Sequence, residues 1–328
     1  MKKSTISVAM CTFNAERFLP EQLESIRIQT RLPDELLIGD DGSNDRTMEI
    51  IRSFAAQVPF RVEAFVNEKN LGTTRNFEKV VGLCTGDIIM LADFDDVWRP
   101  HKLAVIQDTF AANPNAGYVF SNAELIDARG NLIAKSMWGA GNFRGWNPAE
   151  FSGTSQLATL LRRPLATGAA MSIRSGLREL VAPFSLRFIH DYWISLILSC
   201  MEFYGVPIEE PLMSYRQHAS QKTGVRKQSV LQGVEDVRRN LGEDYERIVV
   251  MFEELRERIV ALVGKGHYCP PSHLAMIEEM VVHRQRRLAA RNASAASARF
   301  RLIAAEAISG RYRRFSTSWR SIIRDLCF

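Results

Sequence analysis

The stretch Leu91-Ala92-Asp93-Phe94-Asp95-Asp96-Val97-Trp98 decides how this chain is interpreted, because it places three carboxylates within four positions. It follows the apolar run 87–92, which is short and β-branched and is preceded by Gly86, as in a buried strand. The residue after a strand of an α/β sheet lies at the carboxyl edge, where ligands bind and unpaired buried charges are costly. Mg²⁺ binds one or two carboxylates together with phosphate oxygens, so the stretch predicts a cation and phosphate site. A solvated acidic turn is the alternative.

Composition sets the broad class. The chain has 328 residues, of which 46% are hydrophobic and 24% charged, as in soluble globular proteins with one large domain or two. Its five cysteines are scattered without a C-x-x-C pair, which favours a reducing compartment over a disulfide framework or a zinc site. The apolar run 6–10 is too short for a signal peptide, and the run 192–206 is too short to span a membrane. We therefore expect a cytoplasmic protein.

Charge is distributed unevenly along the chain. The formal net charge is +5, yet residues 284–328 contain 11 arginines, no lysine and two acids, Glu306 and Asp325. The remainder is therefore net acidic. The tail predicts an amphipathic helix that contacts anionic lipid on the cytoplasmic face of the inner membrane, with Phe315, Trp319, Ile322 and Leu326 on one face. Packing against the rest of the chain or a second subunit, as in a homo-oligomer, is the alternative. No base-reading motif accompanies the charge, so nucleic acid is not an expected partner.

The first hundred residues alternate between strand and helix patterns. We expect strands at 5–11, 35–39, 60–66 and 87–92, and helices at 18–29, 45–56 (capped by Asp45) and 73–83. This order predicts a mostly parallel, Rossmann-like sheet with helices on both faces and a ligand site at its carboxyl edge.

The pattern is less regular after residue 100. Helices are expected at 102–112, 188–203, 230–263 and 272–308, strands at 118–122 and 168–173, and a mobile loop over the site at 137–153. The predicted organisation is an α/β domain over 1–218, divided near residue 100 into two halves, and a helical, basic C-terminal extension over 219–328.

Two further segments lie where the parallel strands would end. Asp40-Asp41-Gly42-Ser43 follows the second strand, and its carboxylates can accept hydrogen bonds from a base or a ribose. The loop 67–76 enters a helix whose N-terminus, together with Arg75, suits a diphosphate. An ordinary Asp-Gly turn and a capped helix with a solvated arginine are the alternatives. The sequence lacks the G-x-G-x-x-G and P-loop fingerprints.

Together these segments resemble the family 2 glycosyltransferases, over roughly residues 5–218. Within that family the bacterial rhamnosyltransferase-like enzymes of surface polysaccharide synthesis look most similar. The matching pieces are Val8-Ala9-Met10-Cys11-Thr12-Phe13-Asn14, Asp40-Asp41-Gly42-Ser43, Asn70-Leu71-Gly72 with Arg75-Asn76, Asp93-Phe94-Asp95-Asp96-Val97-Trp98, Thr167-Gly168-Ala169, His190-Asp191-Tyr192-Trp193 and Tyr215-Arg216-Gln217-His218.

The resemblance implies a GT-A fold, in which a nucleotide-binding α/β half is fused to an acceptor half. It implies that Phe13 stacks on the base, that Asp41 contacts a uracil or thymine, and that Arg75 lies near it. The remaining donor-binding positions that it implies are Thr12, Asn14, Asn70, Gly72 and Asp93.

The chemical centre is implied in the same way. Asp93 and Asp95 would hold Mg²⁺ or Mn²⁺, with His218 as a further ligand; a solvated histidine is the alternative. Arg216 and His218 would lie on a loop that closes over the diphosphate. Asp191 would be the catalytic base, with a helix N-cap as the alternative.

The implied function is inverting transfer of a sugar from a UDP- or dTDP-sugar to a hydroxyl of a cell-surface glycan such as O-antigen or capsule. The acceptor is then a glycan or a lipid-linked glycan. A GT-A protein that binds without turnover and an enzyme that uses a polyprenyl-phosphate sugar remain alternatives. A nucleotidyltransferase would need a Gly-rich, Arg-containing loop where the sequence has Cys11-Thr12-Phe13-Asn14-Ala15-Glu16.

Overall fold

The computed structural model describes residues 3–139, 143, 146–151, 154–219, 221, 233–316 and 320–327. The chain divides into two compact units. The first comprises 1–152, 165–198 and 203–226, and the second comprises 153–164, 199–202 and 227–328. The boundary predicted at residue 218 remains a prediction, because most of 220–232 lies outside the described residues.

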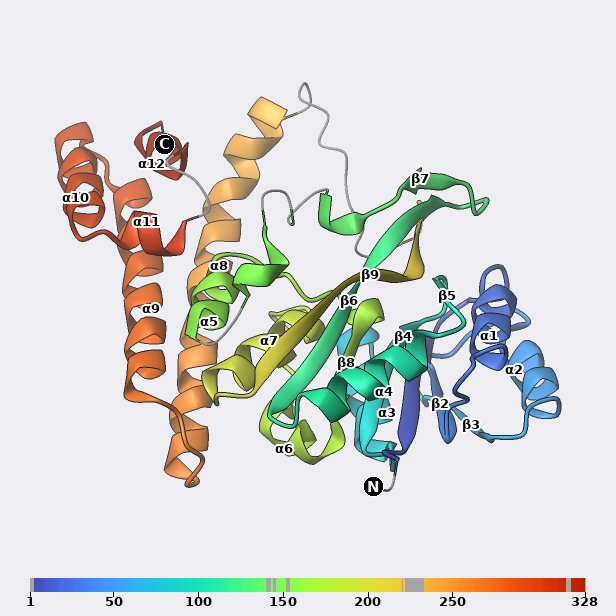
Figure 1. Cartoon of the computed structure of the whole chain (residues 1–328). Coiled ribbons are helices and arrows are strands. Elements are labelled where there is room, and N and C mark those ends of the chain that lie inside the picture. The colour runs from blue at the N-terminus through green and yellow to red at the C-terminus, as the bar shows by residue number, and fades with distance from the viewer. Residues whose placement is uncertain are drawn as a thin grey trace. The chain divides into compact units, whose positions relative to one another are not determined.

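A nine-stranded sheet forms the centre of the first unit, in the order β3-β2-β1-β4-β8-β6-β9-β5, with β7 paired to β6 (Figure 1). The first four strands are parallel, β8 is antiparallel to both β4 and β6, β9 is parallel to β6, and β5 is antiparallel to β9. The sheet is thus mixed: the strands β3, β2, β1 and β4 form the parallel part predicted from the sequence, and β6 with β9 is one further parallel pair. The bounds are β1 Ile6–Thr12, β2 Glu35–Asp40, β3 Arg61–Val66, β4 Ile88–Asp93, β5 Val97–Trp98, β6 Ala116–Asp127, β7 Leu132–Ala134, β8 Met171–Arg174 and β9 Tyr204–Gln217.

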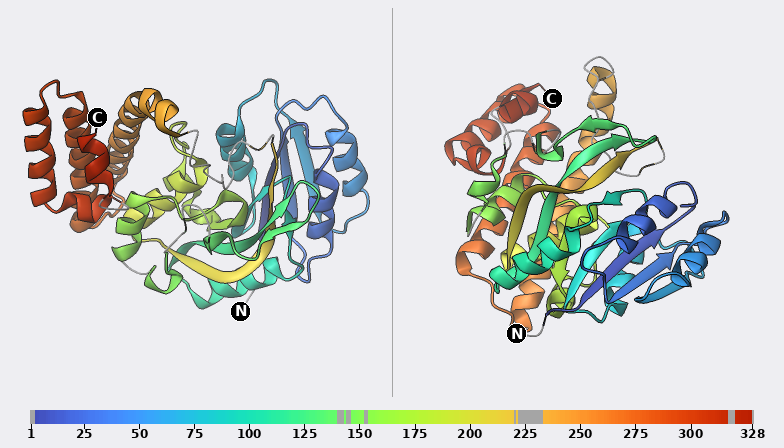
Figure 2. Two further views of the ribbon diagram at one scale, coloured as in Figure 1. Left: turned by 90° about the horizontal axis from the view of Figure 1, so that it is seen from above. Right: turned by 45° about the vertical axis from the view of Figure 1, so that its right-hand side comes forward.

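The register of the parallel strands aligns the ends that form the candidate site. Thr12 pairs with Asp40, and Cys11 pairs with Asp93, so β1, β2 and β4 end at one edge. Every residue of β1 is buried because the strand lies between two neighbours and beneath α3 (Thr73–Leu83). Helices α1 (Leu19–Arg27) and α2 (Thr47–Ala55) lie side by side, as Figures 1 and 2 show.

Close packing of α3 on β2 explains one glycine in this half. A Cβ at Gly39 would lie 2.4 Å from Asn76 Oδ1. Asn76 Nδ2 donates to the Gly39 carbonyl at 2.7 Å, and Asn67 Nδ2 donates to Asn76 Oδ1 at 3.0 Å. This buried amide pair fixes the helix against the strand, in agreement with the predicted helix at 73–83.

Strand β9 corrects one sequence expectation. Residues 204–217 form a 14-residue strand, and Arg216, which we expected on a loop, lies within it. Pro207 and Pro211 interrupt its pattern, and the register with β6 shifts in this region. Proline is rarely found inside a central strand, so the two prolines made this segment look unlike a strand in the sequence. Strand β6 is likewise longer than the predicted 118–122.

The segment 137–153 was predicted to be a mobile loop over the site, and only part of it is described. That part contains two 3₁₀ turns, Met137–Gly139 and Pro148–Glu150. Trp138 packs edge-on to Trp146 at a ring separation of 4.7 Å, and Phe120 contacts both rings. Aromatic packing therefore fixes the described part of the segment 137–153.

The remaining helices of the first unit are close to the sequence expectations. Helix α4 spans Lys102–Ala112, as predicted, and α7 spans His190–Cys200 within the predicted 188–203. The predicted strand at 168–173 begins instead as a 3₁₀ turn, η4 (Gly168–Ala170), and continues as β8. Helix α2 begins at Thr47 with Arg46 at the N-cap position, although Asp45 Oδ1 still accepts the Thr47 amide at 2.9 Å.

The second unit is helical. Helices α9, α10 and α11 pack together, in orange to red in Figure 2. The helix predicted at 272–308 is two helices separated at 293–295, and the amphipathic helix predicted across 315–326 is α11 and α12; Trp319 lies outside the described residues. No helix within the described residues is long and apolar enough to cross a membrane. The bounds are α5 Thr154–Arg162, α8 Gly233–Gly264, α9 Pro271–Asn292, α10 Ala296–Ile308, α11 Arg311–Phe315 and α12 Arg320–Leu326.

Both acids of the basic tail are buried in this unit and paired with arginines. Asp325 accepts hydrogen bonds from Arg287 at 2.6 Å, Arg291 at 2.7 Å and the Tyr312 hydroxyl at 2.6 Å. Burial raises the pKa of Asp325, but these partners outweigh it and hold the pKa below its usual value. Glu306 is paired in the same way with His283 and Arg311, so several tail arginines stabilise the fold.

We expect Asp325→Asn to lower the free energy of unfolding by about 3 kcal/mol, because it leaves Arg287 and Arg291 buried without their counter-charge. The folded-state pKa of Asp325 is depressed, so its contribution is present above pH of about 4 and lost as the pH falls below that value. Urea unfolding followed by circular dichroism at pH 7 and pH 3.5 measures both effects. The exposed Glu257→Gln is the matched control, and equal stability of the two variants at pH 7 would contradict the role of Asp325.

Candidate active site

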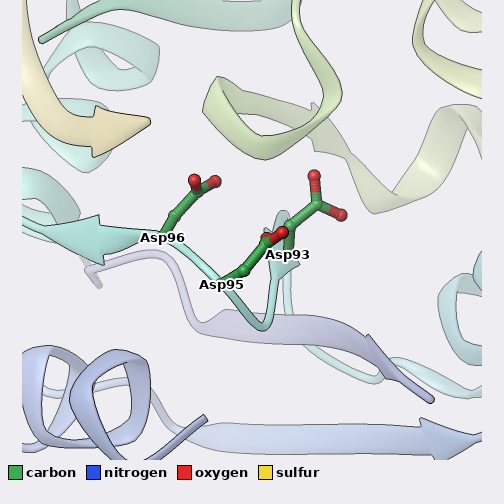
Figure 3. A group of neighbouring side chains, drawn as sticks. All are labelled: Asp93, Asp95 and Asp96. Carbon is green, nitrogen blue, oxygen red and sulfur yellow. The ribbon is translucent and has the colours of Figure 1, made fainter. Parts of the chain in front are cut away.

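Three carboxylates gather where β4 ends. Asp93 is the last residue of β4, and Asp95 and Asp96 follow in the turn to β5. One oxygen from each lies within 4.8 Å of the others. Figure 3 shows Asp93 and Asp96 projecting from the same side of this turn, with the carboxylate of Asp95 between them. The three residues are named the acidic cluster below.

Burial and mutual repulsion destabilise the charged form of the acidic cluster. Burial raises the pKa of Asp93 to about 8, with further contributions from the charges of Asp95 and Asp191. Burial and the charges of Asp95 and Asp93 raise the pKa of Asp96 well above its usual value. Asp96 Oδ2 is buried, and no hydrogen-bond partner for it occurs in the described part of the chain. Oxygen ligands, excess negative charge and an unsatisfied oxygen together fit a hard divalent cation.

His218 belongs to the same centre. It follows β9, 123 residues after Asp95, and its Nε2 lies 2.7 Å from Asp95 Oδ2. Its ring also packs against Phe18, with 4.7 Å between ring centroids. The structure thus brings His218 to the carboxylate with which the sequence analysis grouped it. Its role as a metal ligand remains a prediction.

Arg216 supports the turn that carries the acidic cluster. Its Nε donates to the Asp95 carbonyl at 2.7 Å, and its backbone amide donates to Asp96 Oδ1 at 3.0 Å. Its Nη2 pairs with Glu21 of α1. The side chain is buried in β9, and this position corrects the expectation of a loop residue closing over the diphosphate.

Asp191 lies in the first turn of α7, near enough to the acidic cluster for its charge to contribute to the raised pKa of Asp93. Its Oδ2 accepts the Gly168 amide at 2.6 Å, and its Oδ1 accepts the Tyr192 amide. Burial raises the pKa of Asp191, although His190 and the amide hydrogen bonds oppose the rise. The carboxylate is therefore an oriented group of raised basicity near the cluster, as a general base requires.

Gly168 allows the turn to approach the start of α7. A Cβ at this position would lie 2.7 Å from His190 Nε2 and 3.4 Å from Asp191 Oδ2. The His190 ring stacks on Phe77 with 4.4 Å between centroids, and burial lowers its pKa, so it remains neutral. The motifs at 167–169 and 190–193 thus form one packed arrangement around Asp191.

The predicted nucleotide-binding residues lie around the ends of β1 and β2. Asp41 accepts the Leu71 amide at 2.7 Å and the Gly72 amide at 2.8 Å, and so connects β2 to the loop before α3. Gly72 has a φ of +77°, which a side chain would strain. Asp41 thus shapes this loop, while its contact with a base remains a prediction.

The other predicted donor residues have varied surroundings. Phe13 is 47% exposed, so its ring is available for stacking. Thr12 Oγ1 donates to Asp40 Oδ1 at 2.8 Å, and Asn70 Nδ2 donates to the Asp41 carbonyl at 3.1 Å. Asn14 has a positive φ of 49° in the turn after β1, and Arg75 pairs with Glu78.

Sequence reasoning missed Lys102, and it did not anticipate that Tyr215 lies near the site aspartates. Lys102 is fully buried at the start of α4, and the charges of Asp96 and Asp93 act on it. Burial raises the pKa of Tyr215, as do the charges of all four site aspartates. Lys102 begins an ordinary helix, so no local pattern distinguished it; its proximity to the acidic cluster is visible only in the fold.

The sequence also matches a family model, Glycosyl transferase family 2, over residues 7–179. The chain belongs to this family. An uncharacterised glycosyltransferase of Nostoc sp. is 31% identical over 128 residues, which cover 39% of this chain and 39% of that relative. The chain therefore spans well under two thirds of the length of this relative.

Solved glycosyltransferase structures share the fold of this family 2 member. Residues 1–349 of Staphylococcus aureus TarS, in complex with UDP-GlcNAc, give a TM-score of 0.55 at 16% identity and cover 85% of this chain and 72% of that one. The mannosyltransferase PcManGT of Pyrobaculum calidifontis, in complex with GDP-Man and Mn²⁺, gives a TM-score of 0.52 at 16% identity. The match covers 100% of this chain and 87% of that one. These neighbours establish a GT-A-like α/β fold with a helical C-terminal region.

Proposed function

We propose that this glycosyltransferase is an inverting enzyme that moves a sugar from a UDP- or dTDP-sugar to a hydroxyl of a growing cell-surface glycan. The convergence of the acidic cluster, His218 and Asp191 carries the proposal. These residues come from the end of β4 and the turn after it, from the residue after β9 and from α7, and they lie near one another at the edge where β1 and β2 also end. A cation site and an oriented base at one sheet edge are the two elements that inverting transfer needs.

The donor binds at this edge. Phe13 stacks on the base, and the loop shaped by Asp41 and Gly72 encloses the nucleoside side of the site. Asp93, Asp95 and His218 would hold Mg²⁺ or Mn²⁺, which would supply positive charge to neutralise the leaving diphosphate. Arg216 keeps Asp95 and Asp96 in place through its hydrogen bonds to their turn.

Asp191 removes the proton from the acceptor hydroxyl. As the proton passes to Asp191, the hydroxyl oxygen forms a bond to the anomeric carbon, the bond from that carbon to the diphosphate oxygen breaks, and the nucleoside diphosphate leaves from the opposite face. The configuration is therefore inverted. The Gly168 and Tyr192 amides orient the carboxylate, and its raised pKa makes it a stronger base than an exposed aspartate.

A thermal-shift screen tests the donor site. We expect UDP or dTDP with Mn²⁺ to stabilise the protein by about 2.7 kcal/mol at 100 times the Kd, a shift of several degrees, whereas GDP and CDP do not. Asp95→Asn should remove the metal-dependent part, and the exposed Asp108→Asn should retain it. No shift with any nucleotide would instead favour a polyprenyl-phosphate donor.

Asp191→Asn tests the base. The variant should lose about 10²–10⁴-fold in transfer rate and keep nucleotide affinity, because a side-chain amide at this position cannot accept the proton while the donor contacts are unchanged. Since the pKa of Asp191 is raised, wild-type transfer should decline on acidification at a higher pH than an exposed aspartate would give. Equal loss of transfer and binding would refute the base assignment, and donor binding without transfer in the wild type would indicate a binding protein.

The C-terminal unit supports a second part of the proposal, contact with an anionic membrane that carries a lipid-linked acceptor. Because Glu306 and Asp325 are buried, the exposed charges of α10–α12 are all positive. Exposed apolar side chains accompany them, including Phe300 at 62% and Ile308 at 87% exposure. The predicted Phe315 is fully buried instead, so the apolar surface differs from the face expected from the sequence.

The membrane contact is tested by flotation with vesicles that contain anionic lipid. We expect the joint substitution of Arg301, Arg313, Arg320 and Arg324 by Gln to abolish co-flotation, because each exposed arginine near such a surface contributes about 1 kcal/mol. Neutral vesicles provide the control for charge. Equal flotation of variant and wild type would exclude this surface as the lipid contact.

A further inference from the structure

The turn that follows β1 is anchored on both sides of an exposed aromatic ring. Phe13 is 47% exposed, whereas the preceding Thr12 is buried and pairs with Asp40 in the sheet. The next residue, Asn14, has a left-handed backbone with a φ of +49°, a conformation that needs support from its surroundings. A single exposed apolar side chain is ordinary at a protein surface. The way in which the backbone of this ring is held is the feature that requires an explanation.

Side chains of the segment after β2 hold this turn. Three consecutive backbone amides after Phe13 donate hydrogen bonds to side chains of the segment 43–47. These pairs are Asn14 with Ser43 Oγ at 2.8 Å, Ala15 with Thr47 Oγ1 at 2.8 Å, and Glu16 with Asp45 Oδ2 at 3.0 Å. In the opposite direction, the Asn44 amide donates to Asn14 Oδ1 at 3.0 Å. Both the backbone and the side chain of Asn14 are therefore fixed by the turn after β2.

Ser43 connects these hydrogen bonds to the sheet. Its hydroxyl donates to Asp40 Oδ1 at 2.6 Å and accepts the Asn14 amide, so it bridges the end of β2 and the turn after β1. Thr12 Oγ1 donates to the same Asp40 oxygen at 2.8 Å, and Asp40 Oδ2 accepts the Gly42 and Ser43 amides. A carboxylate has about four acceptor sites. The buried Asp40 therefore binds protein donors with its carboxylate and anchors the turn.

We propose that Ser43 is a positioning residue for donor binding: its hydroxyl joins the turn after β1 to the end of β2 and so holds the backbone from which the Phe13 ring stacks on the nucleotide base. A ring on a free loop would lose conformational entropy when it stacks, whereas a ring on an anchored backbone has lost much of it in folding. The proposal rests on the function proposed above, in which Phe13 contacts the base. It assigns to Ser43 a role that an ordinary Asp-Gly turn does not indicate.

Removal of the Ser43 hydroxyl tests the role directly. Ser43→Ala should fold, because Ser43 is half-buried and the change removes one oxygen from a surface turn. Its affinity for UDP or dTDP with Mn²⁺ should fall about tenfold, since the hydrogen bonds to Asp40 and from the Asn14 amide are both lost. Ser43→Thr keeps the hydroxyl and should restore affinity to within about twofold. The exposed Ser53→Ala removes a hydroxyl from α2 and should leave nucleotide affinity unchanged.

A double-mutant cycle with Phe13→Leu separates positioning of the ring from a general effect on stability. Leucine keeps an apolar side chain at this exposed position, so the variant should fold, but the loss of stacking should lower nucleotide affinity about tenfold. Because Ser43 acts through the ring, Ser43→Ala should change affinity by less than about twofold in the Phe13→Leu background. A merely structural role would cost the same factor in both backgrounds, and that result overturns the proposal.

The experiment is calorimetric titration of UDP and of dTDP, each with Mn²⁺, into the full-length wild type and these variants. Amide hydrogen exchange of the same proteins without nucleotide, followed by mass spectrometry, measures the anchoring of the turn independently of binding. Exchange in the segment 13–16 should be about tenfold faster in Ser43→Ala than in the wild type, while exchange in the strands stays unchanged.

Lower affinity that depends on Phe13, together with faster exchange in the segment 13–16, supports the proposal. Unchanged affinity or unchanged exchange in Ser43→Ala overturns it. A wild-type protein that binds neither UDP nor dTDP refutes the proposed function instead, and the exchange rates then decide whether Ser43 anchors the turn.

Discussion

Parallel pairing of β1 with β2 and β4 is the constraint on which the site depends. Because this register places Thr12 level with Asp40 and Cys11 level with Asp93, the acidic segments after β2 and β4 reach the same sheet edge. Beyond β4, the antiparallel strand β8 and then β6 bring in the second half of the chain. Strand β9, which pairs with β6, places Arg216 and the following His218 at the turn after β4. A change of register in this sheet would move the acidic cluster away from the ends of β1 and β2 even if every residue were retained.

The site gathers several carboxylates where burial makes their charged form energetically unfavourable. Three aspartates repel one another at close range, and burial strengthens the repulsion, as the raised pKa values of Asp93 and Asp96 indicate. The protein retains this arrangement through backbone amides, Arg216 and the buried Lys102. Such stored electrostatic strain is characteristic of sites that bind a cation or an oppositely charged ligand.

In the basic tail, burial decides which charged residues contribute to the surface charge. The sequence predicted either lipid contact or packing for this segment, and in the structure Arg287, Arg291 and Arg311 pair with the buried Asp325 and Glu306. These pairs specify how α9 packs with α12 and how α10 packs with α11, because an unpaired buried charge would destabilise any other arrangement. Only the remaining exposed arginines contribute to the surface charge of α10–α12.

The sequence by itself determined the alternation of strands and helices through residue 112, the acidic turn after β4 and the family resemblance, since these depend on local periodicity and on short motifs. The helices at 73–83 and 102–112 were predicted with their observed bounds for this reason. Only the tertiary structure decided that residues 204–217 form a strand despite two prolines, that Arg216 is buried against the turn after β4, and that Lys102 lies near the acidic cluster. Each of these depends on contacts between residues far apart in the chain, and no local pattern encodes such contacts.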